Sequence, residues 1–233
     1  MTKLYMNDTV IFKLKEVFIQ YFSEQTRPTA QHLFDLVLSI LALNGYTSIR
    51  SLYKHFVQKI SENSLNSYYY TLNESKIDLT DWMEKLISAV LSTIPTENSK
   101  QPIVLAIDDT MVEKSGKTFE CRSHLFDHAA HNGSNYLDGH CFVSLLMNIP
   151  ITGSQYLAVP IGYRMWDGTQ SKLDMAAELV KTAMEQIGKE RSVILCCDSW
   201  YSKKPICHLI QEYENIDIIC NARSDTVLYR LPP

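Results

Sequence analysis

The sequence contains no apolar run long enough to cross a membrane and no targeting segment at its start. The longest apolar candidate, Leu33–Leu43, is interrupted by Asp35 and falls short of the roughly 18 residues that a membrane span needs. The first residues, MTKLYMNDTV, lack the apolar core and the small-residue cleavage site of a secretory signal. We therefore expect a globular protein without membrane contact, in which Leu33–Leu43 forms a core helix.

Cysteine pairs and a basic excess are also missing. The six cysteines include no CxxC pair and form no disulfide framework, so we predict a reducing cytoplasm as the location. The 22 Lys and Arg residues stand against 26 Asp and Glu residues, for a net charge of −4. This balance argues against a dedicated nucleic-acid-binding protein, which is usually basic. The deficit falls in residues 101–233, where carboxylates that bind metal ions would change the working charge.

The sequence changes character at Ser92–Pro102 (STIPTENSKQP), a stretch rich in turn-forming residues that indicates a linker. We therefore predict two domains, residues 1–98 and residues 99–233. Before the linker, apolar residues recur at helical spacing, which predicts an all-helical N-terminal domain. The expected helices cover 8–25, 29–45 with Thr29 as N-cap, 48–60, 64–75, and 79–94 with Thr80 as N-cap.

After the linker, the apolar pattern is typical of buried strands that alternate with helices. Short apolar runs bounded by turn formers predict the strands, and longer stretches with helical spacing predict the helices. Their order is strand, strand, strand, helix, strand, helix, strand, which predicts the α/β class with a mixed sheet and helices packed on its faces. The expected strands are 102–108, 139–149, 155–165, 192–198 and 215–223, and the expected helices are 171–188 and 203–214.

Two of the expected strands end at aspartates. The stretch IVLAIDDT places Asp108 and Asp109 after an apolar run, and VILCCDSWYS places Asp198 in the same way. Because the carboxyl ends of parallel strands form the usual site of an open α/β sheet, we expect these carboxylates to meet. Their hard oxygens suit Mg²⁺ or Mn²⁺, and two such ions about 3.5–4 Å apart perform phosphodiester chemistry. In the alternative interpretation, Asp108 and Asp109 start a turn and Asp198 caps the next helix.

These motifs resemble those of the DDE transposases of bacterial insertion sequences over residues 101–233. The matching stretches are, in order, IDDTMVEKSGKTFE, GHCFVSLL, LCCDSWYSKKPI and ICNARSDTVLYRLPP. The resemblance implies a ribonuclease H-like fold and a nuclease and strand transferase, in which water and then a DNA 3′-hydroxyl attack phosphodiesters at two Mg²⁺ or Mn²⁺ ions. The family's first aspartate maps onto Asp109, which stands directly before Thr110, with Asp108 as the close alternative. The second maps onto Asp198.

The same resemblance implies partners and a location. The partners are DNA at the terminal inverted repeats of a transposon and further copies of the chain assembled on that DNA. The location is the nucleoid within the cytoplasm.

The chain departs from the family pattern at the third metal ligand. The family's glutamate lies on a helix after the fifth strand, in one large group within a Tyr-x2-Arg-x3-Glu pattern, and this sequence lacks that pattern. The glutamates on the earlier expected helices are poor substitutes; they are Glu178, Glu185, Glu212 and Glu214. We therefore expect a truncated reading frame or a fragment, whose own catalytic activity is weak or absent.

Basic residues in two regions are candidates for DNA contact. The stretch SIRSLYKHFVQKISENSLNSYYYTLNES combines the cations Arg50, Lys54 and Lys59 with a run of tyrosines. Two short helices with a turn between them resemble a helix-turn-helix, and such cations suit phosphate contacts. Lys114 and Lys117 follow the first aspartates and can contact a DNA backbone. The alternative for all five is a solvated basic surface.

Three functions therefore compete. The leading one is a DNA transposase, expected to be incomplete. The second is a compact metal-dependent nuclease that uses acidic residues within this chain. The third is a non-catalytic DNA-binding regulator whose N-terminal helices bind transposon ends.

Overall fold

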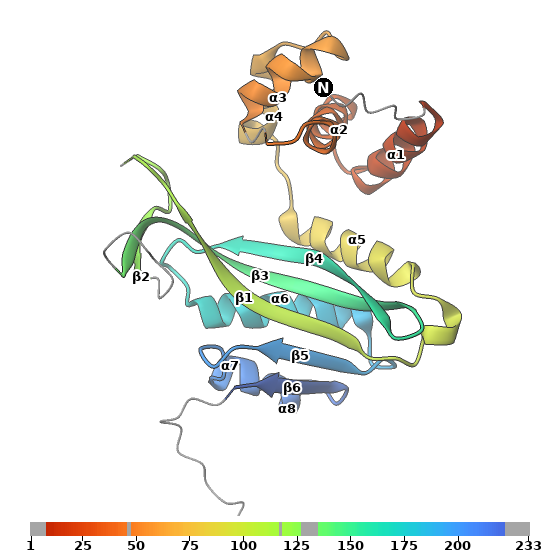
Figure 1. Cartoon of the computed structure of the whole chain (residues 1–233), viewed down its shortest axis with the longest axis vertical. Coiled ribbons are helices and arrows are strands. Elements are labelled where there is room, and N and C mark those ends of the chain that lie inside the picture. Colours follow the sequence, from red (N-terminus) through yellow and green to blue (C-terminus); the bar gives the residue numbers. More distant parts are fainter. Residues whose placement is uncertain (1–7, 46–47, 117, 127–134, 222–233) are drawn as a thin grey trace, which may run out of the picture. The chain divides into compact units, whose positions relative to one another are not determined.

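The computed structural model describes residues 8–45, 48–116, 118–126 and 135–221, and it divides into two compact units, Met1–Trp82 and Met83–Pro233 (Figure 1). The division falls inside helix α5 (Leu79–Ser92). The buried side chains of this helix, Met83, Ile87 and Val90, belong to the core of the second unit. The predicted boundary between the domains of residues 1–98 and 99–233 stays a prediction.

The first unit is helical, as its apolar spacing predicts. Its elements are α1 (Asp8–Tyr21), α2 (Arg27–Ala42), α3 (Ile49–His55), a short 3-10 helix η1 (Val57–Lys59) and α4 (Leu65–Glu74). The N-cap of α2 is Thr26, whose hydroxyl accepts a hydrogen bond from the Thr29 N–H. The prediction of Thr29 as the cap was therefore wrong. Pro28 in the first helical turn explains the earlier start, because proline is favoured where its missing N–H is not needed.

A buried carboxylate explains the charge within the apolar run of α2. Asp35 is 3% exposed, and both of its oxygens accept hydrogen bonds, from the Tyr68 hydroxyl at 2.8 Å and from Gln31 Nε2 at 2.7 Å. Burial raises the pKa of Tyr68 to about 12; the hydrogen bond to Asp35 and the negative charge of Asp35 add to this, while the bond to Ser61 opposes it. The hydrogen bond between Asp35 and Tyr68 joins α2 to α4 within a small apolar core. This bond also makes the burial of the carboxylate possible, because a buried polar group is costly unless it is hydrogen-bonded.

The second unit is built on a six-stranded mixed sheet. Strand β1 pairs antiparallel with β3 and parallel with β5; β5 pairs parallel with β6, and β2 and β4 both pair antiparallel with β3. This order confirms the predicted α/β class and the ribonuclease H-like sheet. The strands are β1 (Ile103–Glu113), β2 (Ser123–Phe126), β3 (Tyr136–Thr152), β4 (Gln155–Met165), β5 (Val193–Cys197) and β6 (Ile216–Cys220).

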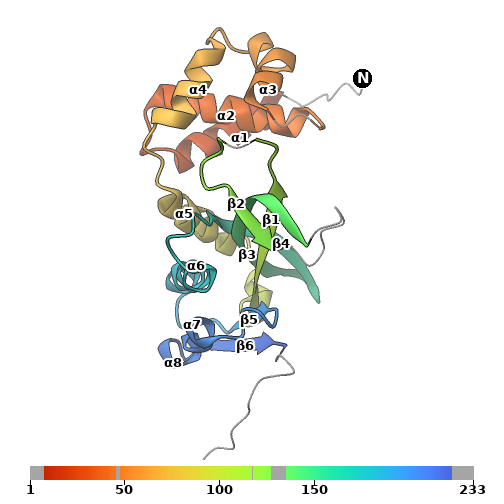
Figure 2. The ribbon, with the colours of Figure 1, turned by 90° about the vertical axis from the view of Figure 1, so that its left-hand side faces the viewer.

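The helices of this unit pack on one face of the sheet. Helices α6 (Lys172–Ile187), α7 (Lys204–Cys207) and α8 (Leu209–Glu212) lie on the same side of the strands in Figure 2. Alternate residues of β1, namely Ile103, Leu105 and Ile107, are buried against them, as the two-residue period of a strand requires. The expected single helix over 203–214 is instead two short helices, with a break at His208.

Strand β1 is longer than expected, and this changes the place of the aspartates. The prediction that the strand ends at Asp108 and Asp109 was wrong, since β1 continues to Glu113. The continuation is held by β3, whose Gly139–Val143 segment pairs with Asp109–Glu113. Strand β2, which pairs with the start of β3, was not predicted from the sequence. Asp108 and Asp109 thus lie within a strand and do not start a turn.

In the part of the chain that the structure describes, no helix is long and apolar enough to cross a membrane.

We predict that Gly139→Ala weakens the distal part of β1. An added Cβ would lie 2.2 Å from the Val112 carbonyl oxygen, so a backbone segment must shift, and we expect the free energy of unfolding to fall by about 1–3 kcal/mol in urea titrations. Gly162→Ala is the control, because its Cβ would meet only the flexible ends of Leu179 and Met83, at 2.9 Å. An equal or larger loss in the control would contradict this account.

Candidate active site

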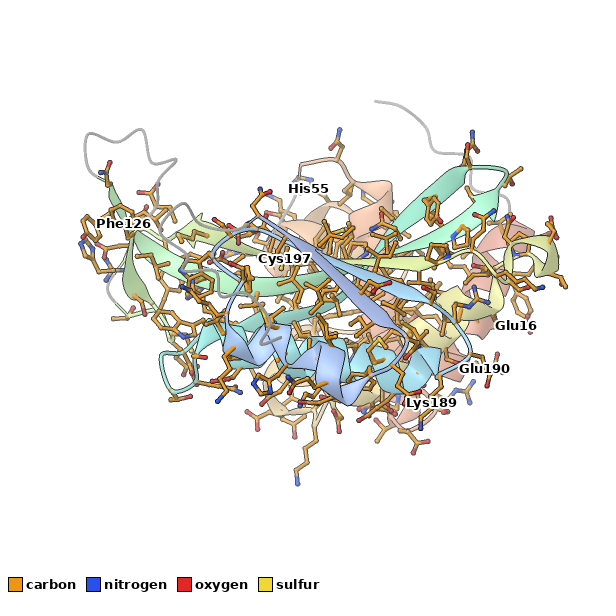
Figure 3. The ribbon with its side chains drawn as sticks, turned by 90° about the horizontal axis from the view of Figure 1, so that it is seen from below. Glu16, His55, Phe126, Lys189, Glu190 and Cys197 are labelled. Atoms are coloured by element: carbon orange, nitrogen blue, oxygen red, sulfur yellow. The ribbon has the colours of Figure 1, made fainter. Side chains whose placement is uncertain are left out.

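The three predicted aspartates lie where β1 separates from β5. The last pair in the parallel register joins Ile107 to Cys197, after which β5 ends and β1 continues along β3 alone (Cys197 is labelled in Figure 3). Asp108 and Asp109 follow Ile107, and Asp198 follows Cys197. Strand pairing therefore brings the two sequence motifs to one edge of the sheet, as the sequence predicts.

The pleat of β1 turns its two aspartates to opposite faces. Asp109 lies on the helix-covered face that Ile107 shares, and its side chain is 18% exposed. Asp108 lies on the other face and is exposed. Its Oδ1 accepts the Asp109 N–H at 2.8 Å, and its carbonyl oxygen accepts the Ser144 hydroxyl at 3.1 Å. The carboxylates of Asp108 and Asp109 therefore lie in different environments. The apolar run that precedes them in the sequence did not predict this difference.

Asp109 has a cationic partner that sequence reasoning missed. Lys172, the first residue of α6, forms an ion pair with Asp109 through Nζ and Oδ2, and its side chain is 17% exposed. The Cys141 thiol donates to the same oxygen at 3.4 Å. Burial is the largest of the causes that raise the pKa of Cys141 to about 11, so this thiol stays protonated at neutral pH. The sequence signal was the position of Lys172 directly after the N-cap Ser171.

Asp198 holds the turn that follows β5. Its Oδ1 accepts the backbone N–H groups of Trp200 at 2.9 Å and Tyr201 at 3.2 Å. The alternative interpretation, in which Asp198 caps the next helix, was wrong: α7 has Lys203 as its N-cap, and Asp198 bonds the turn before it. Both bonds use Oδ1, so they are compatible with a ligand role for the carboxylate.

The side chain of Tyr201 is buried, and its backbone belongs to the turn that Asp198 holds. Tyr201 is 0% exposed, and its hydroxyl has no hydrogen-bond partner within the described residues. Burial raises the pKa of Tyr201 well above its usual value, and the negative charges of Asp109, Asp108 and Asp198 raise it further. An unpartnered buried polar group is rare in proteins, and it marks a place where a ligand or a water would complete the bonding.

The comparisons with known proteins identify the family of this chain. A family model described as DDE superfamily endonuclease matches residues 18–233. The chain belongs to this family. This family match confirms the predicted resemblance to DDE transposases. The bacterial insertion-sequence origin stays a prediction.

Beyond the family model, the matches to this DDE endonuclease are distant. A chain of the Drosophila P element transposase strand transfer complex aligns with 10% identity and a TM-score of 0.28, covering 91% of this chain and 47% of the other. This chain therefore spans about half the length of that transposase. The search of curated proteins found no match.

The donor set of this DDE endonuclease fits a hard divalent cation only in part. The carboxylates of Asp109 and Asp198 supply the oxygen ligands that Mg²⁺ and Mn²⁺ prefer, and the Tyr201 hydroxyl adds an unsatisfied polar atom. Within the described residues, however, no three acidic, histidine or cysteine side chains are arranged to hold a metal ion. Two of the substitute glutamates have partners of their own: Glu178 bonds Gln170, and Glu212 pairs with Lys181.

The predicted DNA-contact residues come from both units. Arg50 and Lys54 on α3 and Lys59 on η1 are exposed in the helical unit. Lys114 follows β1, with its ammonium 6.0 Å from the centre of the Phe119 ring. Lys117 falls outside the described residues. Of these five cations, Lys114 is the one that the structure describes in the same unit as the aspartates.

We predict that Tyr201→Phe stabilises the metal-free protein. Removing a buried hydroxyl without a partner removes a desolvation cost of about 1–3 kcal/mol, part of which should appear as a higher free energy of unfolding. The gain should grow above pH 10, because the folded state keeps the Tyr201 proton that the unfolded state loses, so the wild type loses stability as pH rises. Urea titrations at pH 7 and above pH 10 measure both effects; a destabilised variant would refute the account.

Proposed function

We propose that this DDE endonuclease is a transposase that cuts and joins DNA at transposon ends by two-metal phosphodiester chemistry. The observation that carries the proposal is the parallel pairing of β1 with β5, which ends at Ile107 and Cys197 and so places Asp108 and Asp109 beside Asp198. The family match supports the class of reaction. Carboxylates at the ends of neighbouring parallel strands are typical of functional sites in open α/β sheets.

In this proposal Asp109 and Asp198 are the metal ligands, with Asp108 as the alternative on β1. When bound, Mg²⁺ or Mn²⁺ ions activate the attacking oxygen and stabilise the leaving oxygen of the phosphodiester. Asp109 is held by a rigid strand and Asp198 by its two backbone bonds, so both carboxylates are oriented before a ligand arrives. Such preorganisation is what a reaction with two successive oxygen nucleophiles requires.

The proposed partners are the terminal inverted repeats of a transposon and further copies of the chain. The helical unit would bind DNA through the exposed Arg50, Lys54 and Lys59, and Lys114 and Lys117 would contact the backbone near the cleavage site. Trp200 is 40% exposed beside the aspartates, where its indole could stack on a displaced base. The nucleoid as location follows from DNA as the partner.

One observation favours a second candidate, a non-catalytic DNA-binding regulator. The described residues hold no third metal ligand beside the two aspartates. We therefore expect slow nicking by the 233-residue chain. Fast nicking by this chain would instead favour a compact nuclease that recruits another of its acidic residues.

We predict that Asp109→Asn and Asp198→Asn each abolish metal-dependent nicking. Both substitutions remove the anionic oxygen that the metal prefers, and asparagine at position 198 keeps the oxygen that caps the turn. Loss of a residue that merely supports a ligand costs about 10–100-fold, so we expect a loss on the order of 100-fold or more. Nicking of supercoiled plasmid with Mg²⁺ or Mn²⁺ measures the rate.

The control is Asp217→Asn, which changes an exposed aspartate on β6 and should leave the rate unchanged. Nicking that survives both site substitutions would remove the proposed chemistry. DNA binding that needs no metal, without detectable nicking in the wild type, would leave the regulator as the function.

We predict that Lys54→Ala and Lys59→Ala weaken DNA binding mainly at low salt. If each lysine neutralises one phosphate, the slope of log K against log salt concentration should fall by about 1 per substitution. Fluorescence anisotropy with duplex DNA measures this slope. Lys13→Ala on α1 is the control, since Lys13 is also exposed. Equal slopes in all variants would place the DNA contacts elsewhere.

A further inference from the structure

The ammonium of Lys172 stands at the point where three elements of the candidate site meet. It pairs with Asp109 on β1, and it lies 4.6 Å from the centre of the Trp200 ring in the turn after β5. Lys172 itself begins α6. The side chain therefore bridges the two aspartate-bearing segments, because the backbone N–H of Trp200 also bonds Asp198.

The burial of this pair makes it stronger than an ordinary surface ion pair. Both side chains are less than one-fifth exposed, so water and salt screen their attraction weakly. The ammonium contacts Oδ2 of Asp109, and a magnesium ion on that oxygen would stand about 2.0–2.1 Å from it. An ammonium and a divalent cation that share one carboxylate oxygen would repel each other strongly in such a site.

The pair is not needed to fix α6 on the sheet. That helix buries Met175, Leu179 and Val180 in the main core, and Ser171 caps its N-terminus by accepting the Asp174 N–H. Apolar burial of this extent contributes several kcal/mol, at about 1.5–3 kcal/mol for each large side chain. The ion pair is therefore available for a functional role.

We propose that Lys172 is a tethered cation that occupies Asp109 in the metal-free protein and that a divalent metal ion must displace. The displaced ammonium stays against the face of Trp200, which already provides a cation–π contact. Lys172 thereby keeps the metal-free site neutralised and lowers its metal affinity. This inference rests on the proposed function, since it requires Asp109 to be a metal ligand.

The test is the affinity of the full chain for Mn²⁺, measured from the free-ion signal in electron paramagnetic resonance. Lys172→Met removes the competing charge, so it should bind Mn²⁺ about tenfold more tightly than the wild type, a change of about 1.4 kcal/mol. Lys172→Arg keeps the charge and should bind Mn²⁺ as the wild type does. Lys181→Met is the matched control: it removes a cation of the same helix that pairs with Glu212, and it should leave the affinity unchanged.

Equal or weaker Mn²⁺ binding by Lys172→Met would overturn the inference. Unfolding of this variant, seen by circular dichroism, would also overturn it, because the pair would then be structural. Asp109→Asn separates this failure from that of the proposed function. If Asp109→Asn binds Mn²⁺ as the wild type does, Asp109 is not a ligand, and both the metal site and the inference fail. If Asp109→Asn loses Mn²⁺ while Lys172→Met is unchanged, only the inference fails.

Discussion

The structure of the second unit depends on the divided pairing of β1. Its first half pairs with β5 on one side and β3 on the other, and its second half pairs with β3 alone. At the point of division, the sheet opens an edge at which Asp108, Asp109 and Asp198 collect. Past this division, β3 keeps the backbone of β1 hydrogen-bonded, while β5 has ended.

The charges at this edge are balanced within the protein. Burial, and then the negative charges of the aspartates, raise the pKa of Tyr201, and one lysine pairs with the most buried aspartate, Asp109. Asp198 is committed through one oxygen to its own turn. A site with these contacts exists before any ligand is bound, so ligand binding must exchange one set of interactions for another. This exchange is the physical basis of both the proposed chemistry and the proposed role of Lys172.

Much of this arrangement could be predicted from residue patterns. Apolar periodicity located the strands that carry the aspartates, and their order implied the mixed sheet that the strand pairing confirms. Local details were less predictable. Thr29 was a reasonable cap from its residue type, but Pro28 shifted the helix start to Thr26. Strand β2 and the distal half of β1 were not predicted, because apolar and polar residues do not alternate regularly in them. Their backbones are held by pairing with β3.

The sequence by itself determined the fold class and the two aspartate motifs, because the apolar period and the order of elements along the chain can be read locally. Only the tertiary structure decided that β1 pairs with β5 and so joins the two motifs, that Asp108 and Asp109 face opposite sides, that Lys172 pairs with Asp109, and that the Tyr201 hydroxyl is buried without a partner among the described residues. These contacts join residues far apart in the chain. They depend on how α6 and the turn after β5 pack against β1, which no local pattern records.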